Sequence, residues 1–213
     1  STPFDFDSVD HLESLGTEMY KIASGDITYH DFLRHVAKTG KPIILSTGAS
    51  DMEEIHDAVR VIRGVGNENI VLLHCTLAYP TPLEHANLGM MWHLRREFPN
   101  IPIGFSDHTP GILADVAAVM MGAVMIEKHF THTPGVTSGP EKVGESPDHD
   151  IGLGTDEFTK MVRAVRIIEE SGNVLRCRDN EADALAMLQC HDMEYLFGNT
   201  TMKRVDDAVE LKA

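Results

Sequence analysis

Five short apolar runs, each followed at once by polar side chains, constrain the fold of this chain more than any other feature. Stretches with the apolar spacing of helices lie between them. Strands that alternate with helices build a parallel sheet, and the carboxyl ends of such strands carry the active site. The pattern therefore predicts an enzyme of the α/β class. The runs are YKIAS (20–24), IILS (43–46), IVLLHC (70–75), IGFSDH (103–108) and VMIEKH (124–129).

The polar residues that end the last two runs form a matched pair, Ser106-Asp107-His108 and Glu127-Lys128-His129. Residues two apart on a strand face the same way, so Ser106 shares a side with His108, and Glu127 shares a side with His129. Two neighbouring strands would then direct two imidazoles toward one place, where they suit a divalent transition metal. The alternative is that each histidine is a hydrogen-bonded core or loop residue.

Helices are predicted between the strands from apolar spacing and end signals. Ser50 and Glu53 have the spacing of a capping box before a helix that carries Ile55 and Ile62. Thr155 is predicted to cap an amphipathic helix. The other predicted helices are Asp7 to Leu15, Asp31 to Lys38, Leu88 to Phe98 and Gly111 to Gly122, and the apolar face after Thr155 comprises Phe158, Met161, Val162, Val165 and Ile168.

Two regions lack this alternation. A long Gly- and Pro-containing loop runs from Thr131 to Leu153, and loops longer than usual commonly carry function. Beyond Gly172 the sequence is acidic and without pattern, except for a possible helix from Glu181 to Gln189. We therefore predict one domain over residues 1–172 and a tail or weakly packed appendage over residues 173–213.

The charge of the chain limits its partners. The sequence has 33 acidic and 18 basic residues and a net charge of −15. Nucleic acids and anionic membranes require basic surfaces, so neither is expected as a partner. An anionic substrate would have to be bound by a local cluster of donors.

Cysteine usage and hydropathy indicate the compartment. Cys75, Cys177 and Cys190 give neither an even disulfide framework nor a CxxC pair, as is typical of a reducing cytoplasm. The sequence has no apolar run of about 18 residues and no signal-peptide pattern at its start. A soluble cytoplasmic protein is the expectation.

Several strings in this order make the chain resemble the sialic acid synthase family, from about Ser1 to Gly172. The strings are STPFD, YKIASGD, GKPIILSTGAS, LHCTLAYPTP, NIPIGFSDHTPG, GAVMIEKHFT and SPDHDIGL. That family condenses phosphoenolpyruvate with an N-acetylated aldose such as N-acetylmannosamine and makes nonulosonic acids. The resemblance implies a (β/α)8 TIM-type barrel. It also implies a divalent metal, Mn²⁺ or alternatively Mg²⁺ or Co²⁺, held by His108 and His129.

The resemblance further implies which residues contact phosphoenolpyruvate. These are Thr2, Lys21, Ser24, Ser46 and Ser106. An ammonium and several hydroxyls suit a trianion, although capping of strand ends remains an alternative role for each hydroxyl taken singly.

For the sugar substrate the resemblance implies Tyr79 and Asp148, whose alternative roles are packing in a turn and capping of a loop. Glu127 is the candidate catalytic carboxylate, placed to meet positive charge that develops at C2 of phosphoenolpyruvate. Its alternative role is to orient the imidazoles.

One departure from the family concerns length. Family barrels begin with two further strands and end with an antifreeze-like domain, neither of which this sequence shows. About six strands of the eight are counted here, and Ser1 to Phe4 resemble the end of a strand. The expectation is an N-terminally truncated barrel whose isolated chain does not catalyse condensation.

Two other readings stay open. The chain is alternatively a non-catalytic or split fragment that binds metal or phosphate and needs a partner chain or a second copy. The other alternative is a different metal-assisted aldolase or synthase that uses phosphoenolpyruvate.

Overall fold

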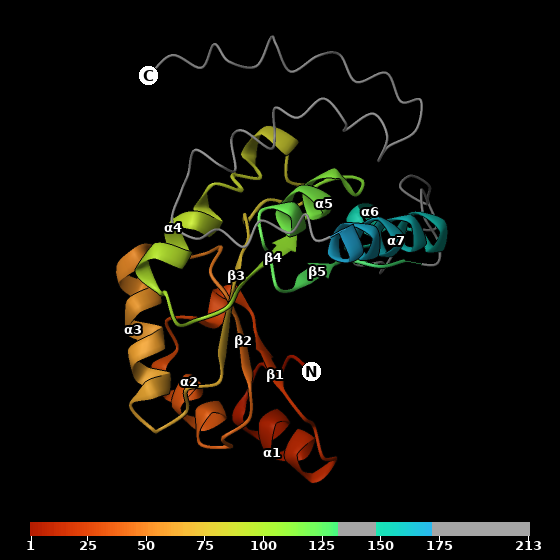
Figure 1. Ribbon diagram of the computed structural model, residues 1–213. Coiled ribbons are helices and arrows are strands. Elements are labelled where there is room, and N and C mark those ends of the chain that lie inside the picture. Colours follow the sequence, from red (N-terminus) through yellow and green to blue (C-terminus); the bar gives the residue numbers. More distant parts are fainter. Residues whose placement is uncertain (132–147, 172–213) are drawn as a thin grey trace, which may run out of the picture.

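Five parallel strands form one sheet in the computed structural model, and they are hydrogen-bonded in the order of the chain (Figure 1). The structure describes residues 1–131 and 148–171. The predicted tail, the possible helix at 181–189 and most of the long loop lie outside these ranges. The strands are β1 (Tyr20–Ile22), β2 (Ile43–Ser46), β3 (Ile70–His74), β4 (Ile103–Asp107) and β5 (Ile126–Lys128).

Helices connect successive strands, as the sequence predicts. None of those within residues 1–131 and 148–171 is long and apolar enough to cross a membrane. The α-helices are α1 (Phe6–Ser14), α2 (His30–Ala37), α3 (Met52–Arg63), α4 (Met90–Glu97), α5 (Leu113–Met120), α6 (Asp148–Ile151) and α7 (Thr155–Ser171), and the short 3₁₀ helices are η1 (Ser24–Asp26) and η2 (Leu83–His85).

The strand order identifies the architecture. In doubly wound folds the order reverses at a switch point, whereas here each strand pairs with the next one in sequence, as in a (β/α)8 barrel. The count of about six strands is corrected to five within the described residues. A single parallel bridge from Phe130 to Leu153 follows β5, and β1 and β5 are not paired with each other in this part of the chain.

The first residues extend this pattern beside β1. The Ser1 amino group donates to the Met19 carbonyl at 3.2 Å, and the Lys21 amide donates to the Ser1 carbonyl at 2.8 Å. Ser1 bonds to the residues on either side of Tyr20, which is the pattern of a parallel neighbour. Ser1 thus lies where the end of a strand preceding β1 would lie, in agreement with the prediction for Ser1 to Phe4.

Two predicted helix caps are wrong by one residue. The capping box of α3 is formed by Asp51 and Glu54, which hydrogen-bond each other's backbone amides, and not by Ser50 and Glu53. At α7 the Phe158 amide donates to the Gly154 carbonyl at 2.9 Å, so Gly154 is the cap and Thr155 is the first helical residue.

The main core lies between the strands and helices α1 to α4. Fully buried side chains of Tyr20, Phe32, Leu45, Ile62 and Leu72 belong to it. A smaller cluster joins α5 to α7 through Val116, Val119, Met120 and Ile168. Both helices lie beside β4 and β5 in Figure 1, so they support the end of the sheet that carries the two histidines.

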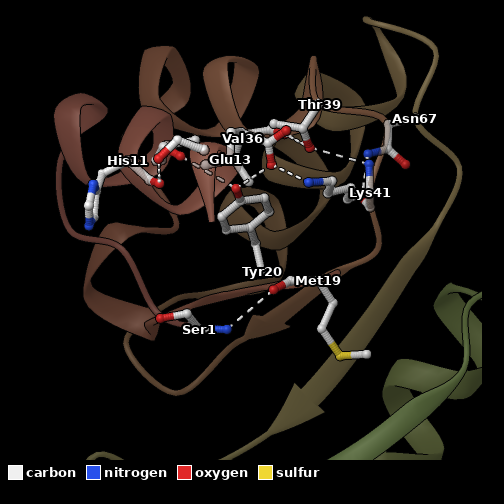
Figure 2. A network of polar contacts seen from close by, with 11 residues as sticks. Ser1, His11, Glu13, Met19, Tyr20, Val36, Thr39, Lys41 and Asn67 are labelled. Carbon is white, nitrogen blue, oxygen red and sulfur yellow. Dashed lines mark hydrogen bonds and ion pairs between the residues drawn. The ribbon is translucent and has the colours of Figure 1, made fainter. Parts of the chain in front are cut away.

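A polar network ties the amino-terminal side of the sheet together (Figure 2). The Tyr20 hydroxyl, at the start of β1, donates to the Glu13 carboxylate. The same carboxylate accepts a hydrogen bond from the Lys41 ammonium at 2.6 Å. Asn67 donates to the Lys41 carbonyl at 2.9 Å and to the Ala37 carbonyl at 3.2 Å. Burial raises the pKa of Tyr20 well above its ordinary value, and the nearby Glu13 carboxylate raises it further. The network lies at the opposite end of the strands from the predicted site, so its role is stability.

Substituting Tyr20→Phe tests that role. Loss of a hydrogen bond to a charged partner is expected to lower the free energy of unfolding by about 1.5–3 kcal/mol, measured by urea denaturation. Phosphoenolpyruvate and metal binding should stay unchanged. A variant as stable as the wild type would show that the hydroxyl contributes nothing.

Candidate active site

Polar side chains collect at the carboxyl ends of the strands, because parallel strands all end at the same edge of the sheet. β1 carries Lys21 and is followed by Ser24, and β2 ends at Ser46. β4 carries Ser106 and is followed by His108, while β5 carries Glu127 and is followed by His129. The structure brings together some of these residues and leaves others apart.

Lys21, Ser106 and Glu127 form one cluster. Ser106 and Glu127 are directly paired across β4 and β5, and the Ser106 hydroxyl donates to Glu127 Oε1 at 2.7 Å. Lys21 Nζ lies 3.5 Å from the same oxygen and donates to the Ile22 carbonyl at 3.2 Å. The Lys21 side chain is 14% exposed and that of Glu127 42% exposed. An ammonium and a hydroxyl that a carboxylate holds at the edge of the sheet are suitable donors for an anionic ligand.

His108 and His129 form a second cluster with Tyr79. The two imidazole centres are 5.4 Å apart, which confirms the facing predicted from strand alternation. The Tyr79 ring lies 4.2 Å from that of His108 and 6.2 Å from that of His129. Asp148 Oδ1, at the start of α6, lies 3.9 Å from His129 Nδ1. The predicted sugar residues, Tyr79 and Asp148, therefore lie beside the histidine pair.

The backbone orients the His108 ring. His108 Nδ1 lies 3.2 Å from the Thr76 carbonyl, which leaves Nε2 as the candidate ligand atom. Burial lowers the pKa of His108, and the neighbouring His129 lowers it further, against the opposing hydrogen bond to Thr76. The neutral imidazole favoured in this way is the form that binds metals.

The histidine pair fits a divalent transition metal. A metal about 2.1 Å from an imidazole nitrogen is roughly 3.2 Å from the ring centre, so two such rings at adjacent coordination positions have centres about as far apart as the 5.4 Å observed. Within the described residues no group of three or more His, Cys, Asp or Glu side chains is arranged to hold a metal. The described residues would therefore supply two imidazoles, and the remaining coordination positions suit oxygen ligands.

The other predicted hydroxyl residues, Thr2, Ser24 and Ser46, make no side-chain hydrogen bond to these clusters within residues 1–131 and 148–171. Ser24 begins η1 and is buried; neither it nor Thr2 makes a side-chain hydrogen bond within residues 1–131 and 148–171. Ser46 Oγ is buried and makes no well-formed hydrogen bond in the same ranges, although the Cys75 thiol interacts with it.

Cys75 ends the third apolar run, but the sequence did not predict a role for it in the site. Burial raises the pKa of its thiol, and the Ser46 hydroxyl and the Lys21 ammonium act in the opposite direction. A β-carbon at Gly48 would lie 2.6 Å from Cys75 Sγ, so a glycine is required at that point for the β2 and β3 ends to approach. Its position directly after the buried β3 strand was a usable signal.

A parallel β/α sheet whose strands pair in chain order, with cationic, acidic and imidazole groups at its carboxyl edge, places the chain in the (β/α)8-barrel class. Comparison with known proteins is more specific. The model of the NeuB family matches residues 1–176. The chain belongs to the NeuB family, which confirms the resemblance to sialic acid synthases and the TIM-type fold, here present as a partial barrel.

Individual relatives agree with this assignment. The chain is 42% identical over 173 residues to N,N'-diacetyllegionaminic acid synthase of Campylobacter jejuni, covering 80% of this chain and 49% of that protein. It is 48% identical over 170 residues to an uncharacterized protein of Methanocaldococcus jannaschii, covering 80% of this chain and 48% of that protein.

A solved structure agrees as well. That of N-acetylneuraminic acid synthetase from Leptospira borgpetersenii, in complex with citrate, superposes with a TM-score of 0.73 at 30% identity and covers 88% of this chain and 62% of that one. The chain thus spans about half the length of the curated relatives it matches.

Proposed function

We propose that this chain is the barrel portion of a nonulosonic acid synthase, which condenses phosphoenolpyruvate with an N-acetylated aldose and releases phosphate. The main support for this proposal is that the Lys21, Ser106 and Glu127 cluster lies on the same edge of the sheet as the two histidines. Relatives named as diacetyllegionaminic and pseudaminic acid synthases support this chemistry.

Phosphoenolpyruvate would bind at the cluster of Lys21, Ser106 and Glu127. The Lys21 ammonium would exchange its 3.5 Å contact with Glu127 for the more highly charged phosphate. Hydroxyls of Ser24, Ser46 and Ser106, and Thr2 from the amino-terminal segment, would add neutral donors around the phosphate and carboxylate.

The sugar would bind beside the histidine pair, Tyr79 and Asp148. A divalent metal, proposed as Mn²⁺, would be held by His108 and His129 and would polarise the aldehyde oxygen of the open-chain sugar when bound. Tyr79 offers a ring and a hydroxyl beside both imidazoles, and Asp148 offers a carboxylate.

The reaction joins C3 of phosphoenolpyruvate to the aldehyde carbon, whose oxygen takes up a proton. The Glu127 carboxylate would stabilise the positive charge that develops at C2. Water then adds its oxygen to C2, the C2–O bond to phosphate breaks, and a 2-keto acid and inorganic phosphate result. Glu127 contacts Lys21 and Ser106, and the Thr76 carbonyl orients His108. This arrangement favours the catalytic role of Glu127 over an imidazole-orienting role.

The substitution Glu127→Gln separates binding from turnover. The amide keeps an acceptor for Ser106 but removes a negative charge that repels the substrate, so phosphoenolpyruvate affinity is expected to rise by up to about fivefold. Turnover is expected to fall by about 10²- to 10⁴-fold. Calorimetry and phosphate release measure the two effects. Weaker binding by the variant would show that the carboxylate positions Lys21 and does not oppose the substrate.

Phosphate release from phosphoenolpyruvate tests the function as a whole, with the isolated chain, for which no turnover is expected, and with a version extended upstream, to which the turnover predictions apply. With Mn²⁺ present, release should require an N-acetylated aldose, and mass spectrometry should find a product of both carbon skeletons. A series of N-acetylated and of phosphorylated, non-acetylated aldoses identifies the substrate, and preference for the latter would indicate a different synthase. Release without any sugar would refute condensation.

A second candidate is a barrel completed by another chain or a second copy. Taken as whole residues, all three β5 residues are partly buried, although the Lys128 side chain is not exposed, whereas β2 and β4 are buried throughout. Within the described residues β1 and β5 are not joined, and unpaired strand edges favour association. Light scattering with and without a co-expressed partner tests this candidate. We also propose a cytoplasmic location, which the free buried thiol of Cys75 supports.

A further inference from the structure

A buried ion pair lies on the face of β4 and β5 opposite the proposed site. Asp107 and Lys128 are paired directly across the two strands, and Lys128 Nζ lies 2.5 Å from Asp107 Oδ2. Their side chains are 0% and 1% exposed. Asp115, from α5, is equally buried and has an oxygen 3.6 Å from Lys128 Nζ. The reaction described above uses none of these three residues.

The contacts of this group surround His108. Lys128 donates to Asp107 Oδ2 and, at 2.6 Å, to the carbonyl of Thr109, so one ammonium binds the residues on both sides of His108. Asp107 also accepts the Thr109 amide at 2.8 Å and the Thr109 hydroxyl at 3.0 Å. Lys128 itself directly precedes His129. The backbone positions of both histidines are thereby linked through a single side chain.

A buried ion pair is a poor choice for stability alone. Removing two charges from water offsets much or all of their attraction, and apolar side chains of similar volume often serve as well. A hydrogen-bonded pair does fix direction and distance, which packing of apolar groups does less strictly. The geometry of the group therefore points to positioning.

Asp115 completes the charge balance. Burial and the adjacent Asp107 carboxylate raise the pKa of Asp115 to about 8, against the opposing effect of Lys128. This direction favours a neutral Asp115, which would leave one carboxylate for one ammonium in the group. Asp115 would then be a polar neighbour contributed by α5.

We propose that Asp107, Lys128 and Asp115 are positioning residues that fix the spacing and direction of His108 and His129. They form a buried clamp, defined by these three side chains, behind the histidine pair. The proposal rests on the proposed function, in which the two imidazoles hold a metal. It adds residues that touch neither metal nor substrate.

Calorimetric titration with manganese tests the clamp in the full chain. Lys128→Met keeps the length of the side chain without its charge and is expected to weaken manganese binding about 10- to 100-fold, as is typical when support for a ligating histidine is lost. Ile62→Ala, in the main core on α3, is the control. It should lower the melting temperature and leave manganese affinity unchanged. Wild-type affinity in Lys128→Met would overturn the proposal.

Substitutions at Asp115 give an independent result if Lys128→Met does not fold. Asp115→Asn keeps a neutral polar group and is expected to bind manganese within about threefold of the wild type, whereas Asp115→Leu is expected to lose about tenfold or more. Equal affinity in the two variants would refute a positioning role for Asp115.

Failure of the proposed function can be told apart from failure of the clamp. If the wild-type chain binds no manganese, the metal assignment is wrong. The clamp is then judged from the imidazole nitrogen-15 signals of His108 and His129. They must shift in Asp115→Leu and keep their positions in Asp115→Asn and Ile62→Ala, and identical spectra in all of these variants would overturn it.

Discussion

Replacing His108 or His129 with alanine is expected to weaken manganese binding more than about 100-fold, beyond the loss typical of residues that only support a ligand. The imidazoles lie 5.4 Å apart, and the described residues offer no third protein ligand in an arrangement that could replace one of them. Calorimetric titration of each variant measures the effect.

The matched control is His56→Ala. His56 lies on α3, where its ring contacts Phe98 and its Nε2 is 3.5 Å from Glu97, and it has no place in the proposed site. Its manganese affinity should equal that of the wild type. If His108→Ala and His129→Ala also retain that affinity, the two histidines are ordinary loop residues.

Lys21→Ala is expected to lose about 10- to 100-fold in phosphoenolpyruvate affinity, because hydrogen bonds to charged groups contribute about 1.5–3 kcal/mol. Ser24→Ala and Ser46→Ala remove neutral donors and should lose about fivefold each. The side chain of Lys21 is 14% exposed, so salt screens it only in part. Affinities must be compared at one stated salt concentration.

The control for charge alone is Lys38→Ala, since Lys38 is an exposed residue that follows α2. It changes the net charge by the same amount and should leave phosphoenolpyruvate affinity unchanged. If the alanine variants of Lys21, Ser24 and Ser46 all lose the same phosphoenolpyruvate affinity, the lysine only supports Glu127.

Strand alternation was sufficient to predict the main features of the site. The apolar runs located all five strands, because a strand buried on both faces is apolar throughout and ends where polar residues begin. The same alternation placed Ser106 with His108 and Glu127 with His129 on one side, as the 2.7 Å bond and the paired rings confirm. These are local properties of a strand.

The clamp could not be predicted in the same way. Alternation places Asp107 and Lys128 away from the site, but only packing of α5 shows that this face is buried and that Asp115 lies on it. Charged residues are seldom fully buried, so the sequence favours solvent exposure for them. Their burial results from contacts between residues that are distant in sequence.

Helix details failed for a related reason. Ser50 and Asp51 are both good capping residues, and the backbone selects Asp51 because α3 begins at Met52. On α7 the predicted apolar face is too wide. Met161 and Ile168 are buried, and Ile168 packs against α5, whereas Val162 is 40% exposed. The width of the buried face depends on the neighbouring helix, which the sequence of α7 does not specify.

The central claim is that one site, built from the ends of β1, β4 and β5, holds phosphoenolpyruvate beside a divalent metal. Relaxation of the phosphorus-31 signal of phosphoenolpyruvate tests it most directly, with manganese fully bound by excess protein. Strong enhancement is expected in the wild-type chain, and it should be lost in Lys21→Ala at the same manganese occupancy. Phosphoenolpyruvate that binds the manganese-loaded chain without enhanced relaxation would contradict the account, because its phosphate would then lie far from the histidine pair.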